Sequence, residues 1–169
     1  MDNNSILLTN LVHIVYIFTG CANPNYSRIQ SFLKHFEWLY IFDFSTNTDE
    51  DFFKSLLLLH ESDERINKVV PFVPEMFIHQ YIGHVHQTVW GPKLWSLLHG
   101  LAAQKNTTPV VVDEVLHNLT NLLPCAKCGR GLSQWLLLNP VCGACPEQHI
   151  NNLHNHVNQK LHKQLTFIF

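Results

Sequence analysis

Residues 122–128 read Leu122-Leu123-Pro124-Cys125-Ala126-Lys127-Cys128, a C-x-x-C pair that stands directly before an apolar run with helical spacing (Leu132, Trp135, Leu136). Two thiols at this spacing can close a small disulfide ring. A helix that begins beside them would stabilise a thiolate and lower the pKa of the thiol. The stretch therefore predicts either a redox-active disulfide or a metal site.

A second C-x-x-C pair, Cys142 and Cys145, follows the first after residues 129–141. Two such pairs at this separation are typical of a ribbon-type zinc site with four thiolate ligands. The residues between the pairs have the apolar pattern of a helix, however, and not that of the short hairpin that a ribbon uses. This pattern favours redox chemistry, with a zinc-ribbon-like binding module as the alternative.

Composition limits the other classes of function. The chain has 169 residues, enough for one large or two small domains, and a net charge of −2 that gives no electrostatic basis for binding nucleic acid or an anionic membrane. Its five Cys are too few for a secreted miniprotein held together by disulfides. None of its 12 His stands in a pattern that predicts a metal site.

The apolar run from Ile6 to Phe18 resembles a signal peptide in length only. No positive charge precedes it, and Asn10 and His13 interrupt it. It is also too short to span a bilayer. We therefore expect a buried strand here, and an intracellular protein.

The first half of the chain predicts alternating strands and helices. Apolar runs with β-branched and aromatic residues predict buried strands, three- to four-residue spacing predicts helices, and Thr48 is placed to cap the second helix. The expected elements are a strand at 11–18, a helix at 29–36, a strand at 38–44, a helix at 49–60 and a hairpin within 69–83. This order is typical of an α/β domain with parallel strands.

Two motifs extend this pattern: a Cys-x-x-Pro turn from Cys21 to Pro24, and Val73-Pro74-x-x-Phe77-Ile78-x-x-x-Ile82-Gly83. Together with the expected elements they make residues 8–87 resemble a glutaredoxin. The resemblance implies a glutaredoxin/thioredoxin-like domain over residues 1–87, with Cys21 at the position of the attacking thiol. Pro24 occupies the place of the second Cys, so the alternative is a scaffold in which Cys21 is a small buried thiol.

The second half predicts four helices. They begin near Pro92, Asp113, Cys128 and Pro146, and apolar residues recur in each at helical spacing. On the first, Trp95 and His99 lie four residues apart and share a face. His154 and Asn158 do the same on the last.

Three motifs occur here in order: Trp90-Gly91-Pro92-x-x-Trp95-x-x-Leu98-His99, then Pro124-Cys125-x-x-Cys128, then His154-Asn155-x-Val157-Asn158-x-x-Leu161-x-Lys163. Over residues 88–165 they resemble the Erv/ALR family of FAD-dependent sulfhydryl oxidases. The resemblance implies a four-helix bundle over residues 88–169, a catalytic Cys125–Cys128 disulfide and a bound FAD. The FAD contacts that it implies are Trp90, Gly91, Pro92, Trp95, His99, His154, Asn155, Val157, Asn158, Leu161 and Lys163.

The activity implied is thiol oxidation. Electrons would pass from dithiols of protein clients through Cys125–Cys128 to FAD and then to O2, giving H2O2. The family also implies a homodimer. Its widely spaced Cys pair after the last motif has no equivalent here, so Cys142, Cys145 and Cys21 are the candidate shuttle thiols. An inactive structural relative is a further alternative.

A thioredoxin-like domain joined to an Erv-type domain also resembles the larger quiescin-type oxidases. Compact Erv-type enzymes occur in large DNA viruses, which implies a viral protein of the cytoplasm, in the viral factory or the virion. The mitochondrial intermembrane space is the cellular alternative.

Overall fold

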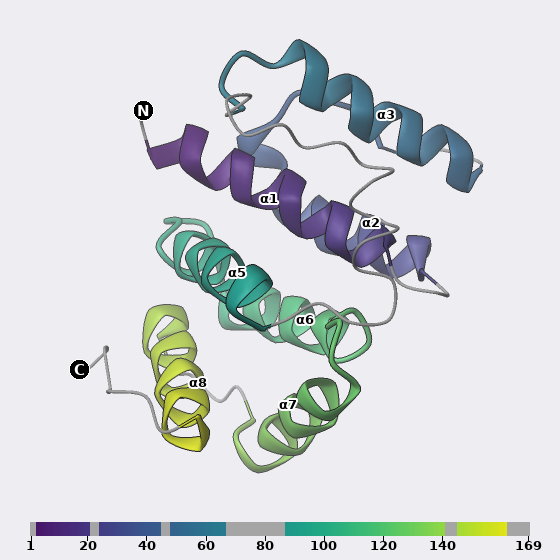
Figure 1. The fold of residues 1–169 in the computed structure, drawn as a ribbon. Helices are drawn as coiled ribbons and strands as arrows, with labels where there is room; N and C mark the ends of the chain where they lie inside the picture. Colours follow the sequence, from purple (N-terminus) through teal and green to yellow (C-terminus); the bar gives the residue numbers. More distant parts are fainter. Residues whose placement is uncertain (1–2, 21–23, 45–47, 67–86, 141–144, 162–169) are drawn as a thin grey trace.

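A computed structural model describes residues 3–20, 24–44, 48–66, 87–140 and 145–161 (Figure 1). Within these ranges every regular element is a helix. None of them is long and apolar enough to cross a membrane. In chain order they are α1 (Asn3–Thr19), α2 (Tyr26–Lys34), the short 3-10 helix η1 (Glu37–Leu39), α3 (Asp49–Ser62), α5 (Gln87–Ala102), α6 (Pro109–Leu119), α7 (Ala126–Leu138) and α8 (Pro146–Lys160).

The prediction of a strand at residues 11–18 is wrong, because these residues belong to helix α1. The helix is buried on nearly all sides: Leu8, Ile14 and Val15 have no exposed surface, and Leu11 and Val12 are 1% exposed. A helix that is apolar all round shows no periodicity, so its sequence looks like that of a strand buried on both faces.

The strand predicted at residues 38–44 is also wrong. The chain forms η1 there and then continues without regular structure to Phe44. Ile41 is 96% exposed, whereas Tyr40 is buried and its hydroxyl donates a 2.8 Å hydrogen bond to the carbonyl of Leu33. Only some of these aromatic and apolar side chains face the core. A run of apolar residues here therefore does not mark a strand that is buried on both faces.

The glutaredoxin-like α/β domain is therefore not supported, because the described part of residues 1–87 is helical. The predicted hairpin within 69–83 lies outside the described residues, and so does Cys21. The helices at 29–36 and 49–60 are confirmed as α2 and α3. The Thr48 side chain caps α3 as expected and accepts a 3.1 Å hydrogen bond from the backbone N–H of Asp51.

The four helices expected in the second half are confirmed as α5 to α8. The helix α6 begins at Pro109, four residues earlier than expected, and Thr108 caps it. The helix α5 packs against α8, and α6 packs against α7. On its other side α5 packs along α1, in the most extensive contact between any two described helices, and α2 lies against α6 (Figure 1).

Gly129 allows α7 to approach the end of α6 closely. A Cβ at this position would collide with the backbone carbonyl oxygen of Thr120, which cannot move aside as a side chain can. We expect Gly129→Ala to lower the free energy of unfolding by about 1–3 kcal/mol. Urea unfolding followed by circular dichroism measures the change, and a Gly129→Ala protein as stable as the native one would contradict this close contact.

His13, on α1, gives the fold a dependence on pH. Burial, with smaller contributions from the nearby Lys93 and His60, lowers its pKa to about 4. Between about pH 6.5 and 4, His13 therefore binds a proton in the unfolded chain but stays neutral in the folded chain. The free energy of unfolding falls as the pH falls through this range. The full loss from this one group is about 3 kcal/mol.

We expect the urea midpoint to drop between pH 7 and pH 4.5, and to drop less in a His13→Gln variant. The half-buried His99 and the buried His149, whose pKa values burial also lowers, add to the slope in both proteins. The comparison of the two slopes isolates His13. Equal slopes would mean that His13 titrates normally in the folded protein.

Candidate functional site

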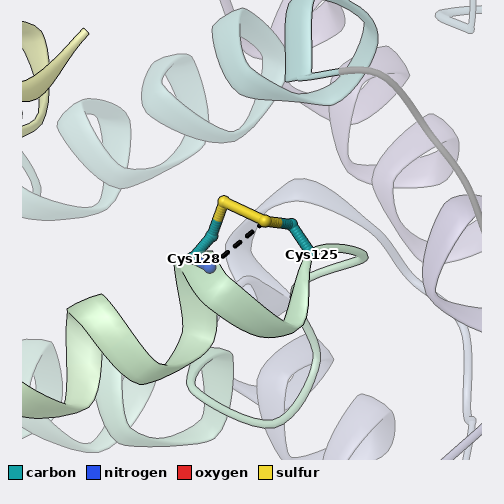
Figure 2. The surroundings of a disulfide bond; sticks show 2 residues. All are labelled: Cys125 and Cys128. Carbon is teal, nitrogen blue, oxygen red and sulfur yellow. Dashed lines mark hydrogen bonds between the residues drawn. A yellow bond between two sulfur atoms is a disulfide. The ribbon is translucent and has the colours of Figure 1, made fainter.

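Cys125 and Cys128 form a disulfide at the N-terminal end of α7 (Figure 2). Cys125 is the N-cap residue of this helix, and its Sγ accepts a 3.1 Å hydrogen bond from the backbone N–H of Cys128. Both residues are half-buried. A side chain at the N-cap usually supplies an oxygen for this purpose, and here a sulfur takes that role.

This position favours negative charge on Cys125 once the disulfide is reduced. The N–H group of Cys128 would then donate to a thiolate, and the positive end of the α7 dipole acts in the same direction. Both effects lower the pKa of a thiol. The local structure therefore supports the redox chemistry predicted from the C-x-x-C spacing.

The disulfide borders a cavity of about 600 Å³. All four helices of the second half contribute to its walls, which are mainly apolar and aromatic. They comprise Trp90, Gly91, Leu94, Trp95 and Leu98 from α5; Leu116 and Leu119 from α6; Leu123 and Cys125 before α7; Lys127, Cys128, Gly131, Leu132 and Trp135 from α7; and Leu153, His156, Val157, Lys160 and Leu161 from α8 and its C-cap. The volume lies within the usual range for small-molecule and cofactor sites.

Three rings join α5 to α8 beside this cavity. Trp95 stacks face to face on His154, with ring centres 4.0 Å apart and planes inclined by 7°. His99 Nε2 lies 3.0 Å from His154 Nδ1, so one imidazole donates a hydrogen bond to the other. Burial lowers the pKa of His99, which favours the neutral form that such a pair needs.

The structure brings only some of the predicted FAD contacts to the cavity wall. Trp90, Gly91, Trp95, Val157 and Leu161 line it. His99 and His154 do not; they contact Trp95 and each other. Other predicted contacts are also absent from the wall: Pro92 is exposed, Asn155 is half-buried and Asn158 is buried, whereas Lys163 lies outside the described residues.

The candidate shuttle thiols are described only in part. Cys145 is exposed and is the N-cap residue of α8, but its side chain makes no capping hydrogen bond. Cys142 and Cys21 lie outside the described residues.

Several wall residues were not predicted as site residues. Leu94 and Leu98 lie four residues apart on α5, and Leu153 lies on the apolar stripe of α8, so the spacing of these three residues is that of ordinary core positions. Trp135 was assigned to the apolar face of its helix without a role. Nothing in the sequence alone indicates that Lys127 and Lys160, from different helices, reach the same cavity.

Residues 92–167 match the Erv1 / Alr family. The match begins in α5 and includes the disulfide, α6, α7 and α8. No curated protein and no solved structure matches the chain. The Erv1/Alr family is one of FAD-linked sulfhydryl oxidases, so the match supports an oxidoreductase that binds FAD in the second half of the chain. The helices α1, α2 and α3 lie outside it.

The cavity is suited to an FAD of the kind that members of the Erv1/Alr family bind. Trp90, Trp95 and Trp135 supply flat apolar surfaces for a ring system, and both sulfurs of the disulfide stand in the same wall. Lys127 and Lys160 are exposed but still reach the cavity, so they lie where it opens to solvent. Their ammonium groups could pair there with phosphate oxygens.

Proposed function

We propose that the chain is an FAD-dependent thiol oxidase that makes disulfide bonds in protein clients. One observation carries the proposal: the Cys125–Cys128 disulfide stands in the wall of an aromatic cavity large enough for a cofactor. The match of residues 92–167 to the Erv1 / Alr family supports it independently.

The first step is exchange between a client dithiol and the disulfide. A client thiolate attacks Cys125 Sγ, which forms a mixed disulfide and releases Cys128 as a thiolate. The second client thiol then attacks the client sulfur of the mixed disulfide and releases Cys125. The client leaves with a new disulfide, and both cysteines are reduced. The N–H of Cys128 holds the negative charge on Cys125 after the second attack.

Bound FAD would supply an acceptor for the two electrons and pass them to O2, giving H2O2. The chain's own part is to re-form the bond between Cys125 and Cys128 as those electrons leave. Their separation already suits this, with Cα atoms 5.2 Å apart. The wall around the two cysteines is mainly apolar, and Lys127 and Lys160 would hold the phosphates at the opening.

A zinc module is less compatible with this site. Zinc in a four-thiolate site needs each sulfur as a free thiolate, and two of the four cysteines in question are joined to each other.

Oxygen uptake with dithiothreitol tests the oxidase directly. We expect the purified, FAD-loaded protein to consume O2 and to release one H2O2 for each O2 consumed. An FAD-loaded protein that consumes no O2 with dithiothreitol would reject the proposal and favour an inactive structural relative.

Cys145 is proposed as a shuttle thiol, together with Cys142, because its exposed position can reach a client that is too large for the cavity opening. We expect Cys145→Ser to leave the reaction with dithiothreitol unchanged, since this small dithiol reaches Cys125 directly. Oxidation of a reduced protein client should slow by about tenfold or more. Equal loss with both substrates would assign Cys145 a structural role instead.

A further inference from the structure

Charge is distributed unevenly along the chain. Before α5 the acidic side chains outnumber the basic ones, whereas the sequence after Glu114 carries a single carboxylate side chain, that of Glu147. The same segment carries four basic side chains, which are Lys127, Arg130, Lys160 and Lys163. The net charge of −2 therefore conceals a basic segment, and this segment contains Cys125 and Cys128.

Three of these basic side chains lie on or against α7, the helix that begins at the disulfide. Lys127 stands between the two cysteines in the sequence and is exposed. Lys160, the last residue of α8, is also exposed, and its Nζ lies 3.9 Å from the place that a Cβ on Gly131 would occupy. Because Gly131 is one turn beyond Lys127 on α7, the two ammonium groups lie along the same stretch of this helix. Arg130 precedes Gly131 and is exposed as well. We call Lys127, Arg130 and Lys160 the basic patch.

No carboxylate offsets the charge of the basic patch in the part of the chain that the structure describes. Helix α7 contains no Asp or Glu, and none of the ion pairs between described residues includes a member of the patch. The two carboxylates of α6, Asp113 and Glu114, pair with histidines instead. Glu147 lies in the first turn of α8, at the opposite end of that helix from Lys160. A molecule that approaches the disulfide therefore meets positive charge.

Bound FAD would leave part of this charge in place. Lys127 and Lys160 reach the cavity, where phosphates would offset them. Arg130 does not line the cavity, and its exposed guanidinium lies in solvent. A guanidinium keeps its charge at any physiological pH and can form paired hydrogen bonds with a carboxylate. Arg130 is therefore the member of the patch that is best placed to act on a client and not on the cofactor.

We propose that the basic patch, through Arg130 above all, selects dithiol clients that carry acidic residues beside their cysteines. The inference rests on the proposed function, which supplies the exchange step: two client thiols become a disulfide, and the Cys125–Cys128 disulfide becomes two thiols. Opposite charge raises the rate at which a client meets the disulfide, and like charge lowers it. Salt screens both effects. The class of substrate is an anionic peptide segment with two thiols.

The test uses two reduced peptides with the same central Cys-x-x-Cys, one flanked by Glu residues and the other by Lys residues. Exchange with the oxidised protein is followed without oxygen by chromatography of the oxidised peptide. Each rate is divided by the rate of the same peptide with dithiodipyridine, a neutral disulfide, because flanking charges also change the pKa of the peptide thiols. We expect the Glu peptide to react about tenfold faster at low salt. This advantage should nearly vanish at about 1 M NaCl.

Arg130→Glu should abolish or reverse the preference for the Glu peptide, whereas the matched control Arg130→Lys keeps the charge and should keep the preference. Neither variant should change the exchange rate with dithiothreitol, which is uncharged, or the dissociation constant for FAD. Equal rates for the two peptides with the native protein, or an unchanged preference in Arg130→Glu, would overturn the proposal. A protein that shows the preference in exchange but takes up no O2 with dithiothreitol would reject the proposed function alone. Absence of exchange with either peptide would overturn both.

Discussion

Replacement of Cys128 by serine should abolish oxygen uptake with dithiothreitol, with a loss of about 1,000-fold or more. A disulfide carries two electrons only if both sulfurs are present, and the cavity offers no other described thiol to replace Cys128. Cys125→Ser should have the same effect for the same reason. The fold should survive in both variants, because the disulfide closes a very short loop and constrains the unfolded chain little.

The control for this experiment is the cofactor itself. Each serine variant should still bind FAD, since the cavity walls are unchanged, so the loss is one of chemistry and not of binding. Oxygen uptake in Cys128→Ser close to that of the native protein would contradict the role given to this disulfide.

Replacement of Gly131 by phenylalanine should block FAD binding. Gly131 lines the cavity, and a Cβ there would meet only the Lys160 Nζ, at 3.9 Å. A larger side chain can therefore enter the cavity without disturbing the backbone. We expect the dissociation constant for FAD to rise by about 100-fold, or about 2.7 kcal/mol.

Gly131→Ala is the matched control. One methyl group leaves the cavity open, so FAD binding should remain normal, and the loss of a glycine inside α7 should stabilise the fold by about 0.5–1 kcal/mol. Isothermal titration with FAD compares the two variants. If Gly131→Phe binds FAD as tightly as Gly131→Ala, the cofactor does not occupy this cavity.

The sequence predicted most of the helices for identifiable reasons. Helices with one polar and one apolar face, such as α2 and α7, show their period directly. Caps marked the start of α3 at Thr48. The prediction is wrong for α1, which is apolar on nearly all sides because it is buried among other parts of the chain. A helix buried in this way does not show the 3.6-residue period that distinguishes a helix from a strand. The glutaredoxin resemblance depended on that error.

The site was predictable where a local motif defines it. Cys125 and Cys128 form the expected disulfide because their spacing and the start of α7 are features of one short segment. Lys127 and Lys160 could not be paired in advance, because they come from helices that meet only in the folded chain. His99 and His154 belong to recognised motifs, yet they contact Trp95 and each other beside the wall and do not line it.

The central claim is that FAD lies within electron-transfer reach of the Cys125–Cys128 pair. It is tested most directly by titrating the purified protein with dithiothreitol in the absence of oxygen while recording its visible absorbance. We expect a yellow protein whose flavin absorbance is bleached by dithiol, and a Cys128→Ser variant that stays yellow under the same titration. A colourless protein that takes up no added FAD and contains zinc would contradict the account.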